Sequence, residues 1–326
     1  MRRHFRSVFA LAWLTTLTVP RLPQAEEPPP SSDRRHIAGH AFLPTSSGVD
    51  APVAVTIFGL ETNLVYGHAT GPFYDRDGIL IDSSRTYDVG GFGESVRFQW
   101  AANKYLALRG ILTTALVSGL NRSAAMVVGT TALVGGSVGA EGSFAVADTA
   151  RLGFALDVQR TPQLNVLVSG AVLKALQERV LDAASALEID QLLTWRPSVA
   201  LSVVPIPAFG LTGRVTYVYS RLSTEAYGFR ERQSIALGAA ADLDVRRLWE
   251  SVPMSVNLVF VDSISLGGEA ENGLLDLSTG LMYTGKKDVD LGVIIGAQRL
   301  HIRPQFPAPL KTDLVYVDFA IRVYWP

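Results

Sequence analysis

Few residues in this chain have the type and spacing that chemistry needs. The 326 residues include no cysteine, which excludes disulfides, thiolate metal sites, cysteine nucleophiles and lipid attachment to a cysteine. His36 and His40 would share a metal ion only from a helix, which Gly39 and the surrounding prolines oppose. His68 and His301 fall in predicted loops, and no G-x-S-x-G motif supplies His301 with a nucleophile. We therefore predict no metal, no cofactor and no enzymatic activity.

Charged residues recur instead at alternate positions along apolar segments. Between residues 314 and 325, Asp318 and Arg322 alternate with large apolar side chains, which is the period of a strand with two different faces. In a membrane barrel the apolar face meets lipid and the charged face lines the lumen, since an arginine facing lipid at mid-depth costs about 2–4 kcal/mol. The predicted lumen-lining charges are Arg97, Arg109, Asp157, Arg214, Asp242, Asp244, Asp276, Asp290, Asp318 and Arg322.

These charges allow two interpretations. They form either a network of ion pairs that fills a narrow interior, or the wall of a lumen that selects solutes. Many of their inward neighbours are small, so the interior has space that water, a loop or a ligand must occupy. These small residues are Ser198, Ala200, Ser202, Ala236, Gly238, Ala240 and Ala320.

The N-terminus has the order of a secretory signal peptide. Arg2, Arg3 and Arg6 precede an uncharged apolar run at residues 8–19, which is too short to span a bilayer, and Ala25 suits a cleavage position. We predict a signal peptide over residues 1–25, a disordered periplasmic leader over 26–51 and a barrel over 52–326. The net charge is −1 and no basic cluster occurs, so no nucleic-acid partner is predicted.

About twelve alternating segments follow residue 52, with short turns and long loops in alternation, and two of the long loops are predicted at residues 67–85 and 119–129. The longest loop contains Ser169 to Leu187, whose apolar residues fall at helical spacing, so we predict an amphipathic extracellular helix there. Such a helix either constricts the barrel or caps its rim. Helical membrane spans at residues 110–121 and 123–140 are the alternative, but frequent glycines in the second run favour a barrel hairpin.

The chain resembles Gram-negative outer-membrane β-barrel proteins over nearly all of its mature length. The resemblance rests on the signal peptide, the strand alternation, the rhythm of the loops and a terminal strand that ends in aromatic residues. It implies residence in the bacterial outer membrane, contact with its lipid, both termini in the periplasm, and insertion by the barrel-assembly machinery. The implied assembly signal comprises Phe319, Ile321, Val323, Tyr324 and Trp325.

Within that class the chain looks most like mid-sized porin-like barrels. The first hypothesis is a passive channel or transporter for small molecules. The alternative is a closed structural or surface-interaction barrel, and a lipid-acting barrel enzyme is a third, less favoured hypothesis.

Overall fold

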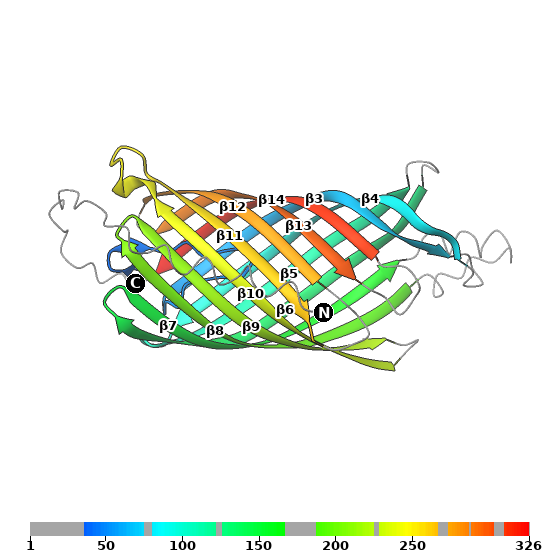
Figure 1. Ribbon diagram of the computed structural model, residues 1–326, viewed down its shortest axis with the longest axis horizontal. Coiled ribbons are helices and arrows are strands. Elements are labelled where there is room, and N and C mark those ends of the chain that lie inside the picture. The colour runs from blue at the N-terminus through cyan, green and yellow to red at the C-terminus, as the bar shows by residue number, and fades with distance from the viewer. Residues whose placement is uncertain are drawn as a thin grey trace, which may run out of the picture. The chain divides into compact units, whose positions relative to one another are not determined.

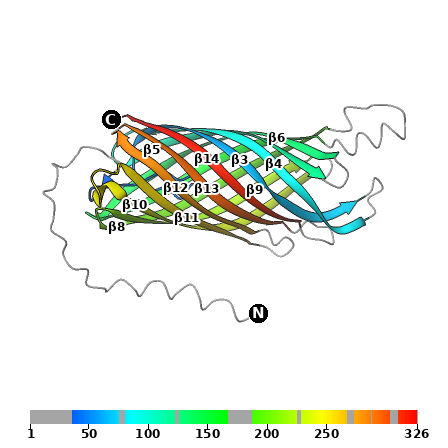
Figure 2. The same cartoon turned by 90° about the horizontal axis from the view of Figure 1, so that it is seen from above.

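Twelve strands form a single closed barrel. The computed structural model describes residues 36–74, 80–121, 126–166, 187–224, 228–266, 273–286, 288–302 and 310–325. Each barrel strand pairs antiparallel with its neighbour in sequence, and β14 closes the sheet against β3, as Figure 2 shows. The prediction of an all-β, up-and-down barrel of about twelve strands is confirmed. The barrel strands are β3 (Thr56–Tyr74), β4 (Leu80–Ala101), β5 (Leu106–Asn121), β6 (Met126–Ala147), β7 (Ala150–Val166), β8 (Leu187–Ile206), β9 (Phe209–Thr224), β10 (Gly228–Asp244), β11 (Met254–Ser265), β12 (Gly273–Lys286), β13 (Val289–Ile302) and β14 (Leu310–Trp325).

The two faces of β14 lie as the alternation predicts. Phe319 and Ile321 are 50% and 47% exposed on the outside, whereas Asp318 and Arg322 are 3% and 1% exposed on the inside. Because side chains of a strand alternate between its faces, one hydrophobic pattern fixes the orientation of the whole strand. The strands are strongly tilted around the barrel, as closure of a twisted sheet requires (Figure 1).

The connections differ between the two ends of the barrel, and two of the longer ones are shorter than predicted. We call the end that holds the β4–β5, β6–β7, β8–β9 and β12–β13 connections the turn end, and the opposite end the loop end. At the loop end, only residues 75–79 separate β3 from β4 and only 122–125 separate β5 from β6. The long loops predicted at 67–85 and 119–129 are therefore largely strand. The strands remain paired through backbone hydrogen bonds beyond their last apolar positions. Hydrophobic alternation therefore cannot predict how far the strands extend.

Two other predictions concern helices. The predicted helix at Ser169 to Leu187 lies outside the described residues, except for Leu187, which begins β8. The segments that the alternative treated as membrane helices belong mainly to β5 and β6. Within the described parts of the chain, no helix combines the length and the apolar character that crossing a bilayer requires. The predicted signal peptide also falls outside the described residues.

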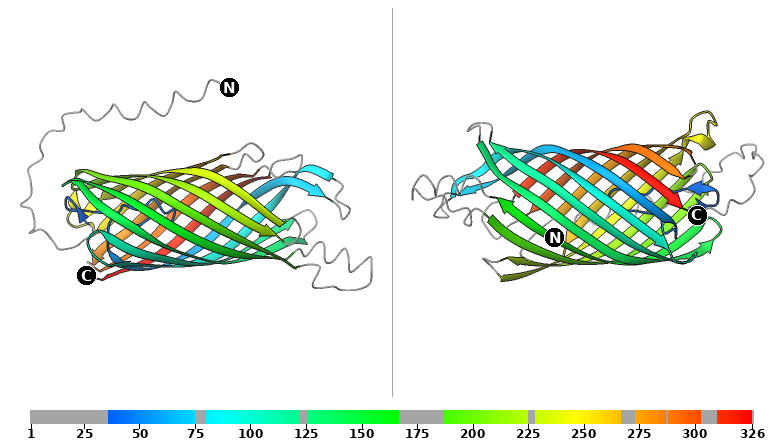
Figure 3. Two further views of the ribbon diagram at one scale, coloured as in Figure 1. Left: turned by 90° about the horizontal axis from the view of Figure 1, so that it is seen from below. Right: turned by 180° about the vertical axis from the view of Figure 1, so that it is seen from behind.

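Residues 36–55 fold back into the barrel and form what we call the inserted loop. It opens with a two-stranded hairpin of β1 (His36–Ile37) and β2 (His40–Ala41), whose turn residues Ala38 and Gly39 have positive φ angles of 49° and 81°. Positive φ at both central positions is typical of tight hairpins. The hairpin lies at the same end as the C-terminus (Figures 1 and 3).

The inserted loop packs against the small residues of the barrel wall. Val49 contacts Ala240 and Val259, and Leu43 contacts Met282 and Ala320. A disordered leader was predicted for residues 26–51, and this prediction is wrong for the part from residue 36 that the structure describes. The proline-rich composition suggested disorder, but the small inward wall residues leave room in which Leu43 and Val49 are buried.

Candidate functional site in the barrel lumen

The tip of the inserted loop, Thr45–Asp50, is held by its own hydrogen bonds. The backbone N–H of Thr45 donates to Oδ1 of Asp50 at 2.6 Å, and that of Val49 donates to Oγ1 of Thr45 at 2.8 Å. Gly48 takes a φ of +75° in this turn, which glycine adopts without steric cost. The turn leaves Oδ2 of Asp50 free to face the barrel wall.

Two wall arginines bind this tip. Nη1 of Arg97 donates to Oδ2 of Asp50 at 3.0 Å and its Nη2 to the carbonyl of Thr45 at 2.9 Å, while Nη2 of Arg214 donates to the carbonyl of Asp50 at 3.1 Å. Burial disfavours the charged form of Asp50, but the nearby Arg97 and Arg214 outweigh it, so the pKa of Asp50 lies below its usual value. The tip is therefore anchored by charge as well as by packing.

A second set of ion pairs continues from Arg214 along the wall. Nη2 of Arg214 lies 3.3 Å from Oε1 of Glu141, which also pairs with Arg109. Arg109 forms a bidentate contact with Asp157, in which Nε lies 2.6 Å from Oδ1. These side chains are almost entirely removed from solvent, and each charge in the set has an opposite charge in contact. Such pairing offsets the cost of burying charges.

The opposite wall carries a separate polar group. Nη2 of Arg322 donates to Oε1 of Glu61 at 2.8 Å, and the hydroxyl of Tyr316 donates to Asp276 at 2.9 Å. Ser47 of the loop tip also donates to Asp276, at 3.1 Å. Asn63 donates to Asp318, and the hydroxyl of Tyr324 donates to Asp290 at 2.6 Å.

The structure places nine of the ten predicted lumen residues on the inner wall. Asp244 differs, because it lies at the end of β10 and caps a short 3-10 helix, η3 (Val245–Arg247), through a 3.1 Å bond from the N–H of Arg246. Asp242 is buried at 2% exposure, beneath the inserted loop. The charges therefore belong to one connected interior rather than to isolated positions.

Sequence reasoning missed four charges of this interior. Glu61, Glu141 and Arg196 alternate with outward residues, so strict period-two counting in β3, β6 and β8 would have found them. Asp50 carried no such signal, because the inserted loop has no periodicity.

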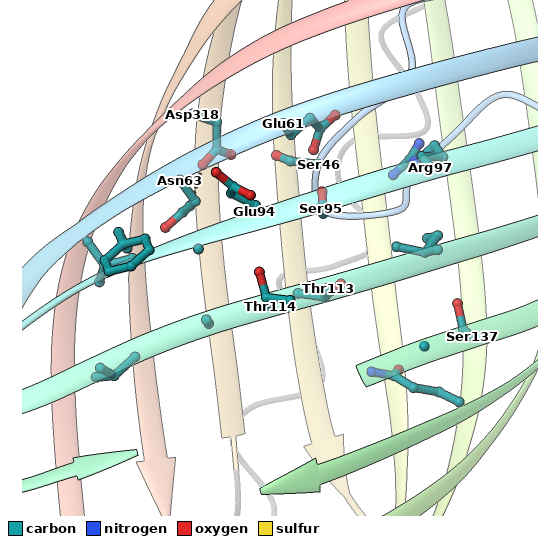
Figure 4. Close-up of a pocket in the computed structure, with 18 of the residues that line it drawn as sticks. Ser46, Glu61, Asn63, Glu94, Ser95, Arg97, Thr113, Thr114, Ser137 and Asp318 are labelled. Carbon is teal, nitrogen blue, oxygen red and sulfur yellow. Dashed lines mark hydrogen bonds between the residues drawn. The ribbon is translucent and has the colours of Figure 1, made fainter. Parts of the chain in front are cut away.

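Three adjoining cavities lie around the loop tip. The first, of about 330 Å³, is lined by Ser46, Glu61, Arg97 and Asp318 among others (Figure 4). Arg196 also lines this cavity. A second, of about 400 Å³, shares Arg97 and Arg196 with the first, and a third, of about 370 Å³, shares Ser46 and Asp318 with it. The part of the lumen beside and beyond the tip is thus hollow, and charged and hydroxyl side chains line it together with apolar ones.

The histidines that the structure describes do not gather into a metal site. His40 is buried, with Nδ1 3.1 Å from the carbonyl of Pro207, and burial lowers its pKa. His68 is exposed, and its Nδ1 lies 2.8 Å from Asp88. Among the described residues, no cluster of three or more side chains suited to hold a metal ion occurs. The side chain of His301 lies outside the described part.

The outside of the barrel is an apolar belt. Leu112, Val138, Leu201 and Leu277 are each 47–69% exposed. Aromatic side chains also lie on this outer surface, both near the turn end and further along the strands. They include Trp100, Phe144, Trp195, Tyr66 and Trp325.

In water this belt would be a very large exposed apolar patch, and soluble monomeric proteins rarely expose such a patch. Glu94 is a departure, since it shares the outer face of β4 with Phe92 and Phe98. A closed antiparallel barrel with an apolar, aromatic exterior and a charged interior is a membrane-spanning barrel of the Gram-negative outer-membrane type.

Comparison with known proteins adds no closer assignment. No family model and no curated protein matches the sequence. Among solved structures, the β domain of the Bordetella autotransporter BrkA shares 10% identity, covering 83% of this chain and all of that one, with a TM-score of 0.47.

Two further solved structures have similar scores. The transport unit of the Escherichia coli autotransporter AIDA-I shares 13% identity over 82% of this chain and 90% of that chain, with a TM-score of 0.46. A Pseudomonas aeruginosa FadL homologue shares 10% identity over 90% and 96%, with a TM-score of 0.41. Likenesses at this level carry no argument about function.

Proposed function

We propose that the protein is a passive channel for small solutes in the bacterial outer membrane, narrowed at the turn end by the inserted loop. The observation that carries this proposal is the set of three adjoining cavities around the loop tip, each with charged side chains in its lining. A barrel whose interior served only for stability would fill that space with side chains, as barrels of eight strands do.

The same proposal includes the surroundings of the barrel. The turn end and both termini face the periplasm, lipid covers the apolar belt, and the assembly machinery recognises the strand that ends in Tyr324 and Trp325. We assign no catalytic activity to the chain.

A closed structural barrel is the second candidate function. The observation that favours it is the anchoring of the loop tip by Arg97 and Arg214, which would keep the lumen shut. The two candidates differ in whether the tip moves, and that difference can be tested directly.

The test uses a reversible lock, because the natural chain contains no cysteine. A Cβ atom placed on Gly238 would lie 3.5 Å from Cβ of Val49, a separation suited to a disulfide. In planar bilayers, the Val49→Cys/Gly238→Cys variant should show conductance steps under reducing conditions that shrink on oxidation and return on reduction. The matched control is Val49→Cys alone, which should not respond.

Each outcome separates the candidates. Silence under both conditions, with a folded barrel shown by heat-modifiable mobility on gels, would overturn the channel and favour the closed barrel. Steps that oxidation leaves unchanged would keep the channel but overturn the role given to the loop.

A further inference from the structure

Arg196 of β8 is an arginine of the cavity wall that lacks a partner among the described residues. Its Nε is inaccessible to water and has no hydrogen-bond partner, and the opposite charge that acts on it is that of Asp157. Arg196 lines both the 330 Å³ and the 400 Å³ cavity. A buried N–H group without a hydrogen-bond partner is costly, so its presence beside a cavity needs a reason.

The charges nearby do not compensate it. Asp157 is the register neighbour of Arg196 across β7 and β8, but both of its carboxylate oxygens already accept from Arg109. Glu141 is shared by Arg109 and Arg214, and Asp50 pairs with Arg97. The 400 Å³ cavity is thus lined by four arginines and two aspartates, and of these arginines Arg196 is the one whose charge is least compensated.

The remaining lining of the 400 Å³ cavity is rich in hydroxyl groups. Thr194 and Ser220, whose hydroxyls lie 3.0 Å apart, line it from β8 and β9. Hydroxyls both donate and accept, so they suit the hydroxyl groups of a ligand. The other hydroxyl residues that line this cavity are Ser47, Ser198, Thr216, Ser234 and Ser263.

We propose that this cavity is a binding site for a small hydroxylated carboxylate, whose carboxylate pairs with Arg196. A guanidinium binds a carboxylate through two parallel hydrogen bonds, and the two planar groups match in shape. This inference names a class of solute for the proposed channel. Passage of the solute rests on the proposed channel function, but binding of the solute does not. Binding itself is measurable without conduction.

Calorimetry of the refolded full chain in detergent tests the site, with sodium gluconate as the probe and glucose as its neutral counterpart. We expect gluconate to bind and glucose not to compete with it. Arg196→Gln should weaken gluconate binding about tenfold or more, because a charged hydrogen-bond pair is lost. The matched control is Arg160→Gln, which removes an exposed arginine that contacts Gln191 at 2.8 Å. It should leave binding unchanged.

Arg196→Lys is the second variant, and it keeps the charge but loses the planar fork, so its affinity should fall between those of the wild type and Arg196→Gln. Equal gluconate affinity in the wild type and in both Arg196 variants would overturn the inference, as would no binding at millimolar concentrations. If the chain conducts but binds no gluconate, the channel stands and the site fails. If gluconate binds through Arg196 while bilayers stay silent, the site stands and the channel fails.

Discussion

The two halves of the lumen differ in how their polar groups are satisfied. Toward the turn end, the inserted loop fills the interior, and Arg97 and Arg214 each donate a hydrogen bond to Asp50 at its tip. Around and beyond the loop tip, cavities remain and the Nε of Arg196 has no hydrogen-bond partner among the described residues. Similar charged side chains therefore hold a segment in place in one half and line a cavity in the other.

The first way to sharpen this comparison is to remove a paired and an unpaired arginine. Arg109→Gln leaves Glu141 and Asp157 short of a buried counter-charge, and it should destabilise the barrel by about 3 kcal/mol. Arg196→Gln removes a charge that has no described partner and should leave stability unchanged or raise it. Urea unfolding followed by tryptophan fluorescence measures both variants. Equal losses in the two would contradict the division of the lumen.

The second prediction concerns the fit of the inserted loop. A Cβ on Gly153 would lie 2.2 Å from Cβ of Pro52, so Gly153→Val should displace the loop and cost about 2 kcal/mol. Gly213 has no atom within 4 Å of its Cβ position, which makes Gly213→Val the matched control. Protease cleavage within residues 36–55 should accelerate in the first variant and stay slow in the second. Unchanged cleavage in Gly153→Val would show that the loop does not depend on this contact.

Much of the fold followed from the sequence. The number of strands, their order and the faces of β14 came from alternation, because lipid and lumen demand opposite side chains at neighbouring positions. The same alternation predicted that charged residues such as Asp157, Arg214 and Arg322 face the lumen.

The inserted loop was not predictable in this way. Its residues have no period, and Asp50 gains its role only from Arg97 and Arg214, which are distant in sequence. The small residues Ala240 and Ala320 indicated space inside the barrel, but nothing in their pattern indicated which segment occupies it. The pairs that hold the loop are long-range contacts, and composition does not encode them.

The smallest predicted effect is a pH dependence centred on Asp50. Because its folded pKa lies below the usual value of 3.8, its contribution to stability is present above about pH 4 and is lost as the pH falls through the folded pKa. Urea midpoints of the wild type and of Asp50→Asn should differ at pH 6, and the difference should shrink as the pH falls below 4. A difference that does not shrink at all between pH 6 and pH 2 would mean that the charge of Asp50 does not hold the loop.

The most direct measurement compares the reactivity of two single cysteines in an otherwise cysteine-free chain. Ser202 is fully buried near the turn end, whereas Ser220 lines the 400 Å³ cavity. With a charged, membrane-impermeant thiol reagent, Ser220→Cys should react quickly and Ser202→Cys slowly, because the inserted loop closes only one half of the lumen. Equal rates for the two cysteines in the folded barrel would contradict the account.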